Sequence, residues 1–175
     1  MKLAWRFLVM VLAIVAGSLV LAACGGGGDE EGLSLEEYFQ QFDAIEEGMK
    51  VSTTALDEQA VATIGEDVQA TQDYVAGYHD IVEKGLNDVK ALEAPSEAKD
   101  AQDEFVASLA NMISLWDGLS DRLANIQTSE ELQTLLVEIQ GETEWLEASQ
   151  KFTDACNALQ AIADEKSIAV TLDCE

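Results

Sequence analysis

The sequence has few basic residues, one histidine, one proline and three cysteines, and these shortages exclude several classes of function. Its 175 residues include 9 Lys and Arg against 34 Asp and Glu, which gives a formal net charge of −25. Nucleic-acid-binding proteins need a basic surface to neutralise phosphates, so this class is excluded. A single histidine, His79, removes most histidine-based metal sites and most catalytic triads. The length suits one domain with a sizeable core.

Known metal and cofactor motifs are missing around His79. A di-iron site needs Glu-x-x-His, but Ala76 stands three residues before this histidine. A haem site would have to place His79 opposite Met49 or Met112, and nothing in the sequence does so. No EF-hand spacing occurs, and adjacent carboxylates on a helix diverge by about 100°. We therefore predict no metal, no cofactor and no catalytic residue, with His79 half-exposed beside a buried face.

Long apolar runs are confined to the start of the chain. Lys2 and Arg6 precede an uninterrupted apolar run over residues 7–16, and small residues follow it. A basic segment, an apolar run and small residues in this order are typical of a secretory signal. The alternative is a single transmembrane anchor over residues 7–23, which is at the short end of the length that spans a membrane.

The leader ends with Leu21-Ala22-Ala23-Cys24, which resembles the lipobox of bacterial lipoproteins. In that family the signal is cut just before the cysteine, which becomes the first residue and is acylated, with palmitate among its acyl chains. The resemblance implies a signal peptide over residues 1–23, lipid on Cys24, and a location on the extracytoplasmic face of a bacterial cell membrane. A flexible Gly-rich and acidic linker, residues 24–32, would follow, and then a helical domain over 33–175.

With Cys24 acylated, Cys156 and Cys174 are left to pair with each other. An exported, oxidising location favours a disulfide between them. Loss of residues 1–23 also removes Lys2 and Arg6, so the mature charge becomes 7 − 34 = −27. An anionic membrane would repel such a body, so the lipid has to hold it there.

The rest of the chain has the composition of helices, with six glycines and one proline from Leu33 onward. The sequence Ser34-Leu-Glu-Glu37 forms a capping-box pattern, and Thr63-Ile-Gly-Glu66 offers a second. An alternative break lies between Gly48 and Thr54. Proline at position 95 ends one helix and precedes the next. The first predicted helix starts near Ser34 and ends before Thr63, and the second runs over about 63–93. The third starts at Ser96, and the fourth runs from Thr128 to about Lys166.

Apolar residues recur at spacings of three and four on each predicted helix, which indicates one buried face per helix. Four similar lengths and short connections predict an antiparallel up-down four-helix bundle, an all-α fold. Residues 167–172 are expected to form an extended tail, which a Cys156–Cys174 bond would hold on the last helix. The predicted inward face of that helix comprises Leu132, Leu135, Ile139, Leu146, Cys156, Leu159 and Ala163.

Some surface and packing features remain open at this stage. Ion pairs at spacing i,i+4 are expected for Glu46–Lys50, Asp80–Lys84 and Glu147–Lys151. The glycines of the predicted helices either allow close helix approach or mark kinks; they are Gly77, Gly85, Gly118 and Gly141. A set of aromatic residues either packs in the core or lines a groove; it comprises Tyr74, Tyr78, Trp116, Trp145 and Phe152.

The C-terminal segment, from Cys156-Asn-Ala-Leu-Gln to Leu172-Asp173-Cys174, resembles the tails of small, uncharacterised helical lipoproteins of bacteria. That resemblance implies no particular activity. We expect a lipid-anchored extracytoplasmic protein that binds an envelope protein or a small ligand and is not an enzyme. Its acidic surface predicts a basic patch or cation on the partner and salt-sensitive association. The alternatives are a passive structural envelope lipoprotein and a hydrolase that uses a carboxylate pair.

Overall fold

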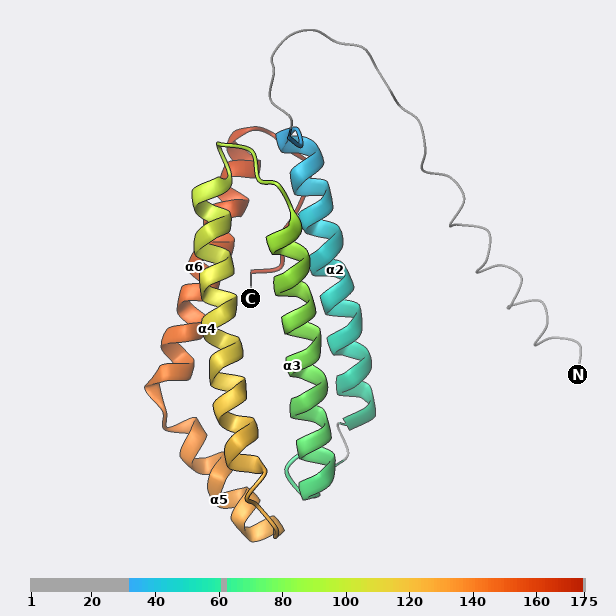
Figure 1. Cartoon of the computed structure of the whole chain (residues 1–175), viewed down its shortest axis with the longest axis vertical. Coiled ribbons are helices and arrows are strands. Elements are labelled where there is room, and N and C mark those ends of the chain that lie inside the picture. The colour runs from blue at the N-terminus through green and yellow to red at the C-terminus, as the bar shows by residue number, and fades with distance from the viewer. Residues whose placement is uncertain (1–31, 61–62, 175) are drawn as a thin grey trace, which may run out of the picture. The chain divides into compact units, whose positions relative to one another are not determined.

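The computed structural model describes residues 32–60 and 63–174. The predicted signal peptide, Cys24 and all of the linker except Gly32 lie outside the described residues. The two described ranges contain five α-helices and no β-strand, so the all-helical prediction is confirmed (Figure 1). No helix among these residues has the length and apolar character needed to cross a membrane.

Consecutive long helices pack against each other and run in opposite directions (Figure 1). α2 packs on α3, α3 on α4, and α4 on α6, while the short α5 lies between α4 and α6 in the chain. The helices are α2 (Leu35–Ala60), α3 (Val68–Ala91), α4 (Lys99–Leu123), α5 (Ser129–Gln140) and α6 (Thr143–Glu165).

Two capping boxes start helices where the sequence predicts them. At α2, Glu37 N–H donates to Ser34 Oγ at 3.3 Å, and Ser34 N–H donates to Glu37 Oε2 at 3.1 Å. Thr128 and Glu131 make the same reciprocal pair at α5. These bonds satisfy backbone donors that a helix start leaves without partners. The hydrogen bonds from Ser34 also lower the pKa of Glu37.

The break predicted near Thr63 is confirmed, because α2 ends at Ala60 and α3 begins at Val68. The capping box predicted at Thr63 is wrong. Asp67 caps this helix instead, and its carboxylate accepts a hydrogen bond from Ala70 N–H at 2.8 Å. The residues before it form a turn in which Gly65 has φ +83°, a left-handed conformation that glycine adopts at little cost. The alternative break between residues 48 and 54 is also absent, since α2 continues through them.

The predicted helix from Thr128 to about Lys166 is two helices, α5 and α6, separated at Gly141 and Glu142. The interruption resets the helical phase, so Leu146, predicted to point inward, is 73% exposed. Glycine has a low helix propensity and ends α5 as its C-cap. Arg122 bridges the break, with Nη2 3.2 Å from Glu138 Oε2 and Nη1 2.6 Å from Glu142 Oε1.

The core consists of two clusters. In the larger one, Phe42 of α2 contacts Phe105 of α4 with ring centroids 5.0 Å apart. Phe105 in turn contacts Phe152 of α6 at 5.3 Å. The smaller cluster lies where α3 and α4 meet α5, and its buried members are Val75, Leu119, Leu123, Leu132 and Leu135.

The helical glycines have different roles. A Cβ on Gly85 of α3 would lie 2.1 Å from Met49 Sδ of α2, and one on Gly77 would lie 3.1 Å from Leu56 Cδ1. A Cβ on Gly118 of α4 would meet nothing within 4 Å. Close approach of α2 and α3 therefore accounts for Gly77 and Gly85, the helix break accounts for Gly141, and nothing in the structure accounts for Gly118.

The variants Gly85→Ala and Gly118→Ala form a matched test of this packing. Both gain about 1 kcal/mol of helix propensity. Only Gly85→Ala must displace the Met49 side chain, and overpacking of this kind typically costs about 1–3 kcal/mol. Urea unfolding should therefore show that Gly118→Ala is more stable than the parent and that Gly85→Ala is less stable than Gly118→Ala, because Met49 has to move. Equal stabilisation by both would contradict the observed close approach.

Candidate functional site

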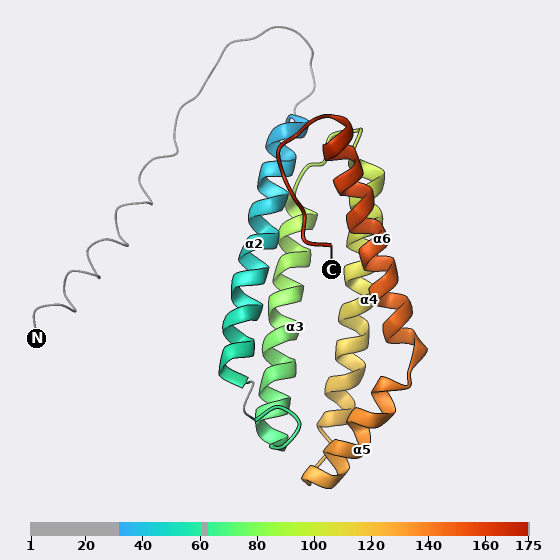
Figure 2. The same cartoon turned by 180° about the vertical axis from the view of Figure 1, so that it is seen from behind.

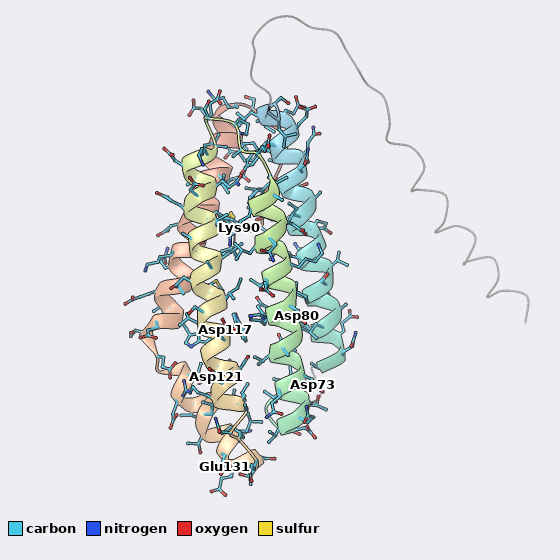
Figure 3. All side chains as sticks on the ribbon, in the orientation of Figure 1. Asp73, Asp80, Lys90, Asp117, Asp121 and Glu131 are labelled. Carbon is cyan, nitrogen blue, oxygen red and sulfur yellow. A yellow bond between two sulfur atoms is a disulfide. The ribbon has the colours of Figure 1, made fainter. Side chains whose placement is uncertain are left out.

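His79 of α3 lies at the interface with α4, between carboxylates from both helices. Its Nε2 atom is 3.0 Å from Asp117 Oδ1 of α4, and its Nδ1 atom is 3.7 Å from Asp80 Oδ1 of α3. The imidazole is 21% exposed, whereas the Asp80 and Asp117 side chains are 83% and 64% exposed. Figure 3 shows these two aspartates at the same level of neighbouring helices. The half-exposed position predicted for His79 is confirmed.

An aromatic row connects the same helices next to His79. The rings of Tyr78 and Trp116 are 4.7 Å apart, and Trp116 contacts Trp145 of α6 edge-on at 5.2 Å. Tyr74 continues the row and donates a hydrogen bond from its hydroxyl to Asp57 Oδ1 of α2 at 2.8 Å. Tyr74, Trp116 and Trp145 pack on the smaller cluster, and Tyr78 packs on the larger one. Of the two alternatives, these aromatic residues therefore pack in the core.

Burial keeps the two tyrosines of this row neutral. It raises the pKa of Tyr78, and the negative charge of Asp57 adds to the effect. Burial together with the hydrogen bond to Asp57 raises the pKa of Tyr74 to about 12. Both phenols therefore stay protonated at neutral pH. The chemically active groups at this interface are the imidazole and the carboxylates.

A groove of about 370 Å³ runs between α3 and α4 beside His79. Ala76 and Ser120 line it, and they stand one helical turn before His79 and one turn after Asp117. Gln72 also lines it and donates from Nε2 to Leu123 O at 2.8 Å. His79 and Asp117 do not line this groove themselves but lie one helical turn away from it on α3 and α4.

Three side chains of α3 have the composition of a metal-ligand set. One ligand atom each of His79, Asp80 and Glu83 lies within 4.8 Å of the others. The sequence search for Glu-x-x-His overlooked them because here the acids follow the histidine. The sequence pattern that could have revealed this set is the spacing of His79 and Glu83, because residues four apart share a helix face. Asp117 could not be found this way, because it belongs to another helix.

The C-terminal tail connects α6 to α2 (Figure 2). The predicted disulfide between Cys156 of α6 and Cys174 is present. Leu172 is buried, and its N–H donates to Gln160 Oε1 at 2.8 Å. On the other side, Lys50 Nζ of α2 is 2.7 Å from Asp173 Oδ2. The sequence predicted that the extended tail is held on α6, but it did not predict the contact between the tail and α2.

The expected i,i+4 ion pairs are largely replaced by others. Lys50 pairs with Asp173 of the tail, and Lys84 pairs with Asp88. In the part of the chain that the structure describes, no ion pair joins Glu147 to Lys151. Because acids greatly outnumber bases, several carboxylates lie within reach of each lysine. Sequence spacing alone therefore does not predict which of them forms the ion pair.

Glu46 of α2 faces the tail, and its carboxylate is strongly perturbed by burial. Burial raises the pKa of Glu46 to about 7. The hydrogen bond from Asp173 N–H, at 3.3 Å, opposes this rise, whereas the negative charges of Asp43 and Asp173 add to it and Lys50 opposes it. The contact between tail and α2 thus includes a carboxylate that takes up a proton near neutrality.

Replacing Glu46 by glutamine tests the effect of this carboxylate on stability. The folded protein holds the proton up to about pH 7, whereas an unperturbed glutamate loses it near 4.5. Stability should therefore fall as the pH rises from about 4.5 to about 7. In urea unfolding, Glu46→Gln should exceed the parent in stability above pH 7 and lose this advantage below pH 4.5. Glu47→Gln changes an exposed residue of the same helix and should keep the parent's dependence of stability on pH. If Glu46→Gln also kept the parent's dependence, the raised pKa of Glu46 would be contradicted.

Two arrangements of the described chain therefore combine groups from different elements: the His79 cluster between α3 and α4, and the tail that joins α6 to α2. The first holds an imidazole and several carboxylates beside a groove, and the second holds a disulfide and a carboxylate of raised pKa. No family model matches this chain, and neither a curated protein nor a solved structure matches it.

Proposed function

We propose that the chain is a lipid-anchored extracytoplasmic protein that binds a cationic partner through its acidic surface. Removal of residues 1–23 would leave acylated Cys24, the linker 24–32 and the helical domain 33–175. The Cys156–Cys174 disulfide is the observation that supports the proposed location. It uses both cysteines of the helical domain and leaves Cys24 of the lipobox-like Leu21-Ala22-Ala23-Cys24 available for lipid. Disulfides persist in oxidising compartments outside the cytosol.

We propose a four-helix bundle for the domain, with α5 and α6 together as the fourth helix. The pairwise packing of α2 with α3, α3 with α4 and α4 with α6 supports it. The tail completes the arrangement by bonding to α6 through Cys174 and to α2 through Asp173. A bundle fastened in this way provides a rigid body on which surface charges keep fixed positions.

The charge distribution supports a cationic partner. Seven basic residues follow the proposed cleavage site, and five of them already contact acids of the chain: Lys50, Lys84, Lys99, Arg122 and Lys166. Exposed carboxylates line the outer side of α3 and α4, and we call Asp73, Asp80, Asp117 and Asp121 the acidic face (Figure 3). A basic segment of an envelope protein or a cationic small ligand matches this face, and salt would screen the attraction.

The intact mass of the protein extracted from membranes tests the anchor. The expected species lacks residues 1–23, carries acyl chains on Cys24 and is two hydrogens lighter than the form with free thiols. The variant Cys24→Ser should keep the leader and gain no acyl mass, because the modified thiol is gone. An uncut parent chain with a free Cys24 thiol would refute the anchor.

Cross-linking in intact cells tests the partner. The parent should give discrete cross-linked species with basic segments, and their yield should fall in high salt. The double variant Asp73→Asn/Asp121→Asn should lower that yield several-fold, because it removes two charges from the acidic face while leaving His79 and its neighbours intact. Glu144→Gln/Asp154→Asn removes the same charge from α6 and should have little effect. Equal losses for both double variants, or no cross-linked species with the parent, would count against binding through the acidic face.

A further inference from the structure

The partner of one nitrogen of His79 determines what its other nitrogen can do. The Asp117 carboxylate is an acceptor, so Nε2 at 3.0 Å carries the proton and donates it to Oδ1. In a neutral imidazole, Nδ1 then presents a lone pair. It lies 3.7 Å from Asp80 Oδ1, so in that state two electron-pair donors are close together. A cation between them would relieve this repulsion.

Glu83 supplies a third ligand from the same helix face. The ligand atoms of His79, Asp80 and Glu83 lie within 4.8 Å of one another, and metal–ligand bonds to imidazole and carboxylate are about 2.0–2.2 Å. Asp80 and Glu83 are exposed and can rotate inward to close the remaining distance. Three protein ligands leave a further position for water.

The position of Asp117 matches a recurrent feature of metal sites. A histidine that binds a metal through one nitrogen commonly donates its other N–H to a carboxylate, which fixes the tautomer and raises ligand basicity. Asp117 makes this contact from α4, while all three ligands belong to α3. The arrangement therefore depends on the packing of two helices.

We propose that His79, Asp80 and Glu83 bind a divalent transition-metal ion of the zinc class, with Asp117 as a positioning residue. A mixed nitrogen and oxygen set favours such ions over Mg²⁺ and Ca²⁺, which prefer oxygen ligands alone. The negative charge of the chain raises the local concentration of cations in general. The imidazole nitrogen makes the site selective for zinc-class ions over Mg²⁺ and Ca²⁺. The inference depends neither on the lipid anchor nor on a protein partner.

Zinc titration of the detergent-solubilised full chain tests the site. Zn²⁺ would be added in competition with a chromophoric chelator and in the presence of excess Mg²⁺, which saturates unspecific acidic positions. One site per chain is expected, and His79→Ala should weaken it at least tenfold. Asp117→Asn should weaken it about 10- to 100-fold, the usual effect of losing such a carboxylate.

Asp73→Asn is the matched control, because it removes one exposed carboxylate of α3 outside the cluster. It should bind Zn²⁺ as the parent does. Equal affinities for the parent and His79→Ala would overturn the proposal and assign binding to the diffuse acidic surface. Absence of a saturable site in the parent would overturn it as well.

Nitrogen NMR of the His79 imidazole gives a readout that does not depend on affinity. Zinc should shift the Nδ1 resonance selectively while Nε2 keeps its proton. If both nitrogens remain protonated and unchanged on addition of zinc, the imidazole is a cation paired with Asp80 and Asp117, and the proposal fails. Glu83→Gln keeps the imidazole and its contact with Asp117, so it tests the ligand set even if His79→Ala unfolds the chain.

Discussion

The structure depends on burial of apolar side chains between helices that carry a large excess of negative charge. In proteins most helical stability comes from tertiary packing of an apolar face rather than from helix propensity. The aromatic contacts from Phe42 through Phe105 to Phe152 join α2, α4 and α6 in one cluster. Without this burial, repulsion between the carboxylates would separate the helices. The positions of His79, Glu46 and the C-terminal tail depend on that packing.

The excess of acid also determines where unusual chemistry occurs. On the open surface a carboxylate is solvated and its charge is screened. At an interface between elements it loses water and meets groups from another part of the chain. Glu46 does so between α2 and the tail, and its pKa rises as a result. The imidazole of His79 is largely buried between α3 and α4, with its Nε2 atom 3.0 Å from Asp117 Oδ1. The chain's chemically distinctive groups therefore lie at contacts between elements.

Sequence patterns predicted the elements well where local physical chemistry decides them. The capping box at Ser34, the helix start at Thr128 and the helical character of the body are confirmed, because each depends on residues close in sequence. The pattern located the break near Thr63 but misplaced the start of the next helix, because Gly65 forms a turn there. It failed at Gly141, because an apolar spacing that continues across a break hides the change of helical phase. Leu146 is exposed for this reason.

The amino-acid sequence by itself determined the helical class and the charge of the surface, since composition suffices for them. It predicted the pairing of Cys156 with Cys174 only through the lipobox resemblance, which assigns Cys24 to lipid. Tertiary structure alone decided that Asp117 meets His79, that Lys50 meets Asp173, and that Glu46 is buried against the tail. Each of these contacts joins residues far apart in the chain. Their geometry depends on how neighbouring helices are rotated about their axes and how closely they approach, and glycines such as Gly85 help to set that approach. No local pattern encodes such a rotation, because it results from the packing of all the side chains at once.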